Sequence, residues 1–149
     1  MLFSKRLNIE MSATSELRAQ LEKRDKKCCL YCLTTEDNCG LRMHVDHIIP
    51  VSAGGNTIPE NLCLACFSCN VHKGARQTWK DPLTQETVPL FHPLRQNWNE
   101  HFSWDESKTR ITGLSSCGRA TIEVLKMNNS TVVNARKRWV SAGWHPPEE

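Results

Sequence analysis

The pattern of apolar and polar residues predicts a helix, two strands and a second helix in the first half of the chain. Leu17 and Leu21 stand one helical turn apart among charged residues, after the capping residue Ser15, which predicts a short amphipathic helix over residues 15–24. Residues 41–49 are rich in β-branched side chains and end at Pro50, as a strand does. A turn-rich segment, a second short strand at 61–64 and a helix opening at 69–70 follow.

The second half of the chain carries weaker patterns. Residues 81–91 predict a turn and a short extended arm, and two helices are predicted over residues 118–128 and 131–141. Ser130 is the expected N-cap of the last helix and Gly143 its end. Trp98 and Phe102 lie one helical turn apart, a spacing that favours a place in the core over a base-stacking platform.

Composition limits the architecture and the compartment. A chain of 149 residues with 39% hydrophobic residues can bury one core and a small appendage. No apolar leader and no run of membrane-spanning length is found, so we expect a cytoplasmic protein with no membrane contact. In a reducing compartment, closely spaced cysteines are expected to bind metal. The net charge of +3 is too small to argue for nucleic-acid binding by itself.

Two Cys-x-x-Cys pairs predict a structural zinc site. Cys29 and Cys32 form the first pair, Cys66 and Cys69 the second, and such pairs are typical of tetrahedral zinc bound by four thiolates. Spacing alone leaves the ligand choice open, because Cys63 also forms a Cys-x-x-Cys pair with Cys66 and Cys28 adjoins Cys29. The short strand favours packing of Cys63 as a small apolar side chain. The expected non-ligands are Cys28, Cys39, Cys63 and Cys117.

The central motifs resemble those of a known family. The run His-Val-Asp-His-Ile-Ile-Pro-Val-Ser-Ala-Gly-Gly at 44–55, Asn61-Leu62, and Ala-Cys-Phe-Ser-Cys-Asn-Val-His-Lys-Gly at 65–74 resemble the HNH endonucleases in their zinc-bound, ββα-metal form. The resemblance implies an α+β fold with an N-terminal arm at 1–14, a nuclease core at 15–80 and a helical, basic C-terminal extension at 81–149. The extension more loosely resembles that of small stand-alone bacterial HNH proteins.

The resemblance also implies a chemistry, hydrolysis of DNA phosphodiester bonds to leave 5′-phosphate and 3′-hydroxyl ends. His47 is the expected general base, since imidazole titrates near neutral pH. Asp46 and Asn70 are the expected ligands of a catalytic Mg²⁺ or Mn²⁺, which prefer such oxygen donors. Asn61 is expected to bond to backbone across the loop and so hold the base in position. Regular strand pairing would place Asp46 and His47 on opposite faces of the strand, which is a small objection to their acting at one site.

Other polar residues around the motifs have weaker assignments. Lys73 and Arg76 follow the site and could hold DNA phosphates. His72 is set about 200° around the helix from Asn70, too far to share one ion, and His44 is at most a second-shell partner of Asp46. We expect Cys66→Ser to lose zinc and melt early, and Asp46→Ala to fold normally.

The C-terminal region has the main basic concentration. Residues 107–147 carry seven Lys or Arg against Glu123 alone, and a helical hairpin there could bring Arg136, Lys137 and Arg138 to DNA backbone. A different class of function also fits the cysteines and the basic region, a non-catalytic, zinc-ribbon-like module that binds DNA or another partner. A homodimer would allow double-strand cleavage, but the sequence does not test for one.

Overall fold

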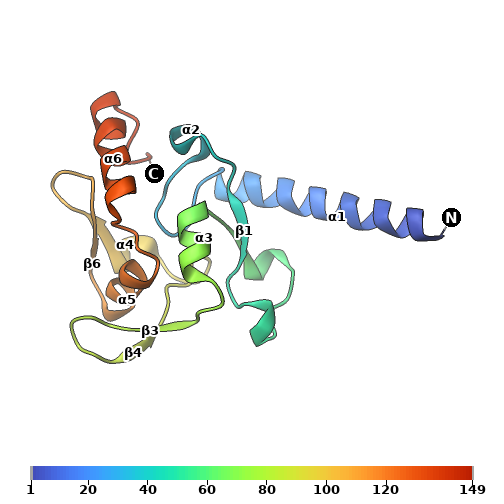
Figure 1. Ribbon diagram of the computed structural model, residues 1–149, viewed down its shortest axis with the longest axis horizontal. Coiled ribbons are helices and arrows are strands. Elements are labelled where there is room, and N and C mark those ends of the chain that lie inside the picture. The colour runs from blue at the N-terminus through green and yellow to red at the C-terminus, as the bar shows by residue number, and fades with distance from the viewer. Residues whose placement is uncertain (1, 149) are drawn as a thin grey trace.

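The computed structural model describes residues 2–148 of the chain, and the side chains from residue 14 onward. It opens with α1 (Leu2–Asp25), whose N-terminal part extends away from the rest of the molecule (Figure 1). The helix begins well before the predicted start at Ser15, because neither proline nor glycine interrupts residues 2–14. The predicted arm at 1–14 is therefore helical from Leu2, and Met1 lies outside the described residues.

The C-terminal end of α1 is tied to the central hairpin by charged side chains. Arg24 donates to the carbonyl oxygens of Pro59 at 2.7 Å and Leu62 at 2.6 Å. The buried Asp25 accepts a hydrogen bond from the Leu64 backbone amide at 2.9 Å. These bonds fix the direction in which the chain enters the first cysteine pair.

The central unit is an antiparallel hairpin with a helix packed against it. Strand β1 (His44–His47) pairs with β2 (Leu62–Ala65), and α3 (Phe67–Lys73) lies beside β1 (Figure 1). The predicted order of strand, loop, strand and helix is confirmed. The strand starts at His44 and not at residue 41, because the chain leaves α2 (Glu36–Cys39) through the left-handed Gly40. The connection between β1 and β2 contains the short 3₁₀ helices Val51–Ala53 and Pro59–Asn61.

The rest of the chain, from Thr78 onward, combines two more antiparallel hairpins with three helices. The hairpins pair β3 (Thr78–Lys80) with β4 (Thr87–Pro89) and β5 (Phe102–Trp104) with β6 (Ile111–Gly113), and the helices are α4 (Trp98–His101), α5 (Ser116–Val124) and α6 (Ser130–Ala142). The N-cap of α6 is Asn129, which accepts from the Val132 amide, and not the predicted Ser130. Gly143 ends α6 in the left-handed conformation, as predicted.

One apolar core joins the central unit to the extension. It contains buried side chains from both, including Leu21, Tyr31, Leu64, Phe102 and Leu125. The rings of Trp98 and Phe102 lie 5.2 Å apart, centroid to centroid, and Phe102 is buried, which is the core packing expected for this pair. The molecule has the mixed α+β architecture that the sequence predicts.

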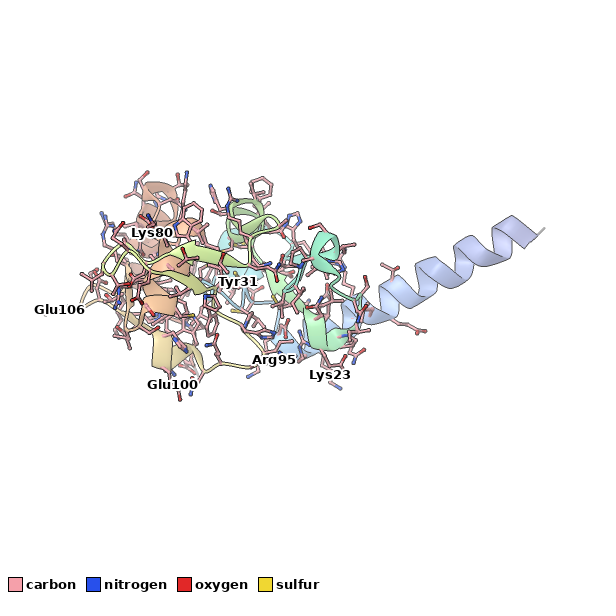
Figure 2. All side chains as sticks on the ribbon, turned by 90° about the horizontal axis from the view of Figure 1, so that it is seen from below. Lys23, Tyr31, Lys80, Arg95, Glu100 and Glu106 are labelled. Atoms are coloured by element: carbon pink, nitrogen blue, oxygen red, sulfur yellow. The ribbon has the colours of Figure 1, made fainter. Side chains whose placement is uncertain are left out.

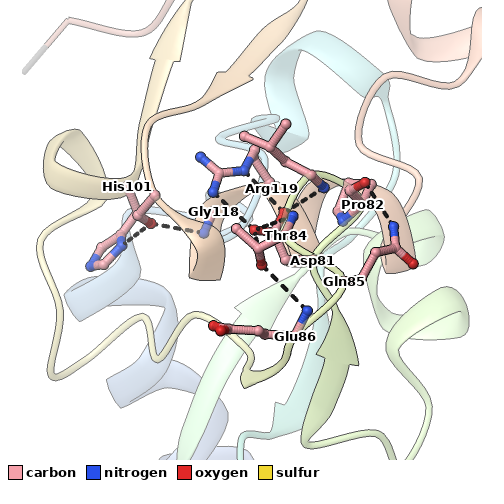
Figure 3. Close-up of polar contacts among 10 residues, drawn as sticks. Asp81, Pro82, Thr84, Gln85, Glu86, His101, Gly118 and Arg119 are labelled. Atoms are coloured by element: carbon pink, nitrogen blue, oxygen red, sulfur yellow. Dashed lines mark hydrogen bonds and ion pairs between the residues drawn. The ribbon is translucent and has the colours of Figure 1, made fainter.

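A buried ion pair fastens the β3–β4 hairpin to α5. The Asp81 carboxylate accepts hydrogen bonds from Arg119 at 2.9 and 3.0 Å and from the Thr84 hydroxyl at 2.8 Å (Figure 3). The Arg119 guanidinium holds the pKa of Asp81 well below its usual range. No helix within residues 2–148 combines the length and apolar character that a membrane span requires.

Candidate metal centre and active site

The four cysteines predicted as zinc ligands come together in the structure. The Sγ atoms of Cys29, Cys32, Cys66 and Cys69 all lie within 4.8 Å of one another, and those of Cys32 and Cys66 are 3.6 Å apart. A tetrahedral zinc with bonds of about 2.3 Å separates its sulfurs by about 3.8 Å, so the cluster fits this ion. Cys66 is also the N-cap of α3 and accepts from the Cys69 amide, which ties the metal centre to the helix.

The other cysteines lie outside this cluster. Burial raises the pKa of Cys28 to about 12, and burial followed by the nearby Asp46 raises that of Cys63. The pKa values of Cys39 and Cys117 are raised as well, again by burial. The pKa values of the clustered Cys29 and Cys69 are raised too, Cys29 first by burial and Cys69 first by its hydrogen bond with Cys29, so position and not pKa distinguishes the two sets. The fold thus separates the two cysteine sets that spacing alone could not.

The carboxylate of Asp46 is buried and already carries two partners. It accepts from the Tyr31 hydroxyl at 2.9 Å and pairs with the Lys73 ammonium at 3.0 Å. Lys73 also donates to the backbone carbonyl of His47 at 2.9 Å. Lys73 therefore spans the Asp46–His47 dipeptide from α3.

Two expectations about this pair are corrected. Lys73 was predicted to contact DNA phosphates, but its side chain is only 2% exposed and its charge is used inside the protein. The Asp46→Ala variant was expected to fold normally, but removing Asp46 would leave a buried ammonium without its counter-charge. The positive charge of Lys73 on α3 therefore belongs to the protein core.

His47 lies on the face of β1 opposite to Asp46. Its Nε2 is 2.9 Å from the Thr57 hydroxyl, and its ring is half-buried. Within the described chain, the other ring nitrogen, Nδ1, makes no hydrogen bond. If Nε2 carries the proton and donates to Thr57, Nδ1 is the free base.

Asn61 holds the loop between His47 and Thr57. Its side-chain oxygen accepts from the Ile49 amide at 2.9 Å, and its side-chain nitrogen donates to the carbonyls of Ile49 at 3.0 Å and Asn56 at 2.9 Å. This is the backbone bonding across the loop that the sequence predicts for Asn61. A Cβ at Gly55 would collide with the Ile49 carbonyl, so the loop can close this tightly only on a glycine.

Asn70 lies on α3 one turn before Lys73. Its carboxamide makes no hydrogen bond with residues 14–148, and none of the contacts described there joins it to Asp46. The oxygen of Asn70 is therefore available to a ligand. His72 instead bonds to Ser68 through Nδ1 at 2.8 Å, and the ring of His44 packs against that of Phe67.

A basic pocket of about 340 Å³ adjoins the end of β1. Its wall includes Ile48 and Ile49, which directly follow His47, and the cations Lys73, Arg76 and Arg95. His92 also lines it, with a pKa lowered first by burial and then by Arg95. No acidic side chain lines this pocket. Figure 2 shows Arg95 at the edge of the molecule and Tyr31 within it.

The predicted basic surface of the last helix is only partly present. Arg136, expected at the DNA backbone, is fully buried and donates to the carbonyls of Thr109 at 3.0 Å and Met127 at 2.8 Å. Lys137 and Arg138, its neighbours on α6, are exposed. The 3.6-residue helical period explains the difference, since Arg136 shares the inward face with Val133 and Trp139.

Sequence reasoning missed Tyr31, Thr57 and Arg95. Tyr31 could have been suspected, because it stands inside the first Cys-x-x-Cys pair and that pair must lie near the motif. Thr57 and Arg95 carry no local signal, since each reaches the site only through the folding of a loop or of the extension.

Comparison with known proteins finds similarity in the segment that carries these residues. Residues 29–76 match the model of the HNH endonuclease family. This segment therefore resembles the HNH endonucleases. The HNH segment contains both cysteine pairs, the Asp46–His47 dipeptide, Asn61 and Asn70.

A curated relative matches a longer stretch of the chain. The Septu protein PtuB of Bacillus thuringiensis is 29% identical over 114 residues, which cover 74% of this chain. The match spans only 40% of the length of that relative. A comparison with the solved structures gave no match.

Proposed function

We propose that this protein is a divalent-metal-dependent endonuclease that hydrolyses phosphodiester bonds of DNA. The observation that carries the proposal is the Asp46–His47 dipeptide, held from one side by Lys73 and from the other by the Asn61 loop, within the segment that resembles the HNH endonucleases. A strand end held so firmly allows a base and a metal ligand to act at fixed positions.

His47 is the proposed general base. The Nε2–H group donates to the Thr57 hydroxyl, and Nδ1 takes the proton from the attacking water. Asn61 fixes the backbone immediately after His47 and the loop that brings Thr57, so it orients both the ring and its partner. Lys73 holds the His47 carbonyl and thereby the direction of the strand.

Asp46 and Asn70 are the proposed ligands of the catalytic ion. They supply a carboxylate and a carboxamide oxygen, a donor set that suits Mg²⁺ or Mn²⁺, and the Asn70 oxygen is not engaged elsewhere in residues 14–148. The bound ion would supply positive charge for the scissile phosphate and the leaving oxygen. Asp46 would keep Lys73 and Tyr31 as partners that hold its carboxylate in place.

The zinc centre has a separate, structural role in this proposal. Four thiolates close its coordination and leave no open position for substrate. It joins the segment after α1 to the start of α3, which carries Asn70 and Lys73. A cytoplasmic location would keep these four thiols reduced.

The basic pocket beside β1 is the proposed site of the DNA backbone. Arg76 and Arg95 are exposed, lie close to the end of the catalytic strand and face no acidic side chain in the pocket. Cations in such a position bind phosphate and position the strand without reading its sequence. Lys137 and Arg138 on α6 remain proposed as further backbone contacts.

A supercoiled plasmid tests the proposal. With Mg²⁺ or Mn²⁺, the zinc-loaded wild type is expected to produce nicked circles with 5′-phosphate and 3′-hydroxyl ends, and His47→Ala is expected to produce none. Since Asp46 already has Lys73 as its counter-charge, the same residues could serve a binding module without catalysis. Tight DNA binding with no cleavage under either ion would favour that module.

A further inference from the structure

The buried Arg136 lacks a counter-charge in the protein. It is 0% exposed, and no carboxylate among residues 14–148 lies within ion-pair distance of it. Its two terminal nitrogens donate to the carbonyls of Thr109 and Met127, and one also approaches Asn128 at 3.4 Å. Its Nε is buried and has no hydrogen-bond partner.

The surroundings of Arg136 point to the missing partner. It lines a cavity of about 20 Å³, which is room for about one water, together with Cys32, Cys66 and Cys69 and the exposed Lys126. Its guanidinium also lies over the ring of Trp104, 5.1 Å from the ring centroid. The cation thus lies over an aromatic ring and beside a cavity that it shares with three of the four cysteines of the metal centre.

Burial of an uncompensated charge is strongly unfavourable, whereas four thiolates on Zn²⁺ carry a net charge of −2. We propose that Arg136 is the buried counter-cation of the zinc–thiolate centre, so that the bound zinc and the C-terminal extension stabilise each other. The proposal rests on the zinc site proposed above. It explains why an arginine, with its unpartnered Nε, points inward from a helix that could have placed an apolar residue there.

The test compares the zinc affinity of full-length variants. Arg136→Gln removes the charge, Arg136→Lys keeps it, and Arg138→Gln is the matched control on the exposed face of α6. In competition with a chromogenic chelator, Arg136→Gln is expected to bind zinc about 10- to 100-fold more weakly, as for other lost second-shell partners. Arg136→Lys should recover most of this loss, and Arg138→Gln should keep the zinc affinity of the wild type.

Replacing zinc by cobalt gives an absorption spectrum that would not change if the role of Arg136 were purely structural. Removing a cation beside the thiolates raises the energy of their electrons, so the sulfur-to-cobalt absorption of Arg136→Gln should shift to longer wavelength and that of Arg136→Lys should not. An Arg136→Gln protein with wild-type zinc affinity and an unchanged cobalt spectrum would overturn the proposal.

The wild type provides a second measurement if Arg136→Gln does not fold. Hydrogen exchange of residues 130–142 should accelerate when the chelator removes zinc, and unchanged protection would also overturn the proposal. Plasmid nicking is assayed separately. Zinc coupling without nicking refutes the nuclease only, and nicking without zinc coupling refutes the counter-cation only.

Discussion

Replacing Lys73 by methionine tests whether the Asp46–Lys73 pair belongs to the core. The ammonium is 2% exposed and the carboxylate 6% exposed, at 3.0 Å, so the substitution leaves a buried negative charge with only the Tyr31 hydroxyl as partner. Loss of one member of a buried pair costs about 3–5 kcal/mol. For a chain of this size, about 2–4 °C per kcal/mol gives a melting temperature lower by about 6–20 °C.

The assay is thermal unfolding of the zinc-loaded protein, followed by circular dichroism. Lys80→Met is the matched control, because Lys80 is exposed, and it should melt within about 1 °C of the wild type. Asp46→Asn combined with Lys73→Met removes both charges and should recover most of the loss. If Lys73→Met melted like the wild type and lost only DNA affinity, Lys73 would face the nucleic acid and the present account of α3 would be wrong.

Three further outcomes are expected. Asn61→Ala should lower stability by roughly 1–3 kcal/mol and reduce plasmid nicking about 100-fold, since it frees the loop that positions His47; an unchanged nicking rate would remove its orienting role. Burial, and then the charge of Arg136, lowers the pKa of His145 to about 4. The neutral form of His145 therefore stabilises the fold above the unfolded pKa of about 6.5, and about 1–2 kcal/mol of the free energy of unfolding should be lost as the pH falls towards 4. Urea titrations across this pH range should show a smaller loss of the free energy of unfolding for His145→Phe than for the wild type. An equal loss in both proteins would show that His145 is not the group responsible. Arg95→Gln should weaken DNA binding several-fold and reduce the salt slope by about one, measured by fluorescence anisotropy on the zinc-loaded His47→Ala background without added Mg²⁺ or Mn²⁺; an unchanged slope would exclude Arg95 from the interface.

The parts of the molecule that the sequence predicts well are those encoded by local patterns. The hairpin and helix follow from β-branched runs, a proline and closely spaced cysteines. The backbone bonding of Asn61 is what the resemblance to the HNH endonucleases implies. The four thiols were chosen from spacing and strand alternation, and the same four come together in space.

The failures concern charged residues that the fold buries. Lys73 and Arg136 look like surface cations in the sequence, because the groups near them lie far away along the chain. Asp46 is 27 residues from Lys73, and the cysteines beside Arg136 come from the first half of the chain. No local pattern distinguishes a lysine that binds phosphate from one that neutralises a buried carboxylate. The long α1 was also missed, since helix propensity without an apolar period gives a weak signal.

We propose that a hard cation binds between Asp46 and Asn70 while Lys73 and Asn61 hold the strand. The most direct measurement is the anomalous scattering of Mn²⁺ in crystals of the zinc-loaded His47→Ala variant with a DNA fragment. A manganese peak is expected within about 2–2.5 Å of oxygens from both side chains. Manganese bound only elsewhere, with the Asn70 carboxamide turned away from Asp46, would contradict it.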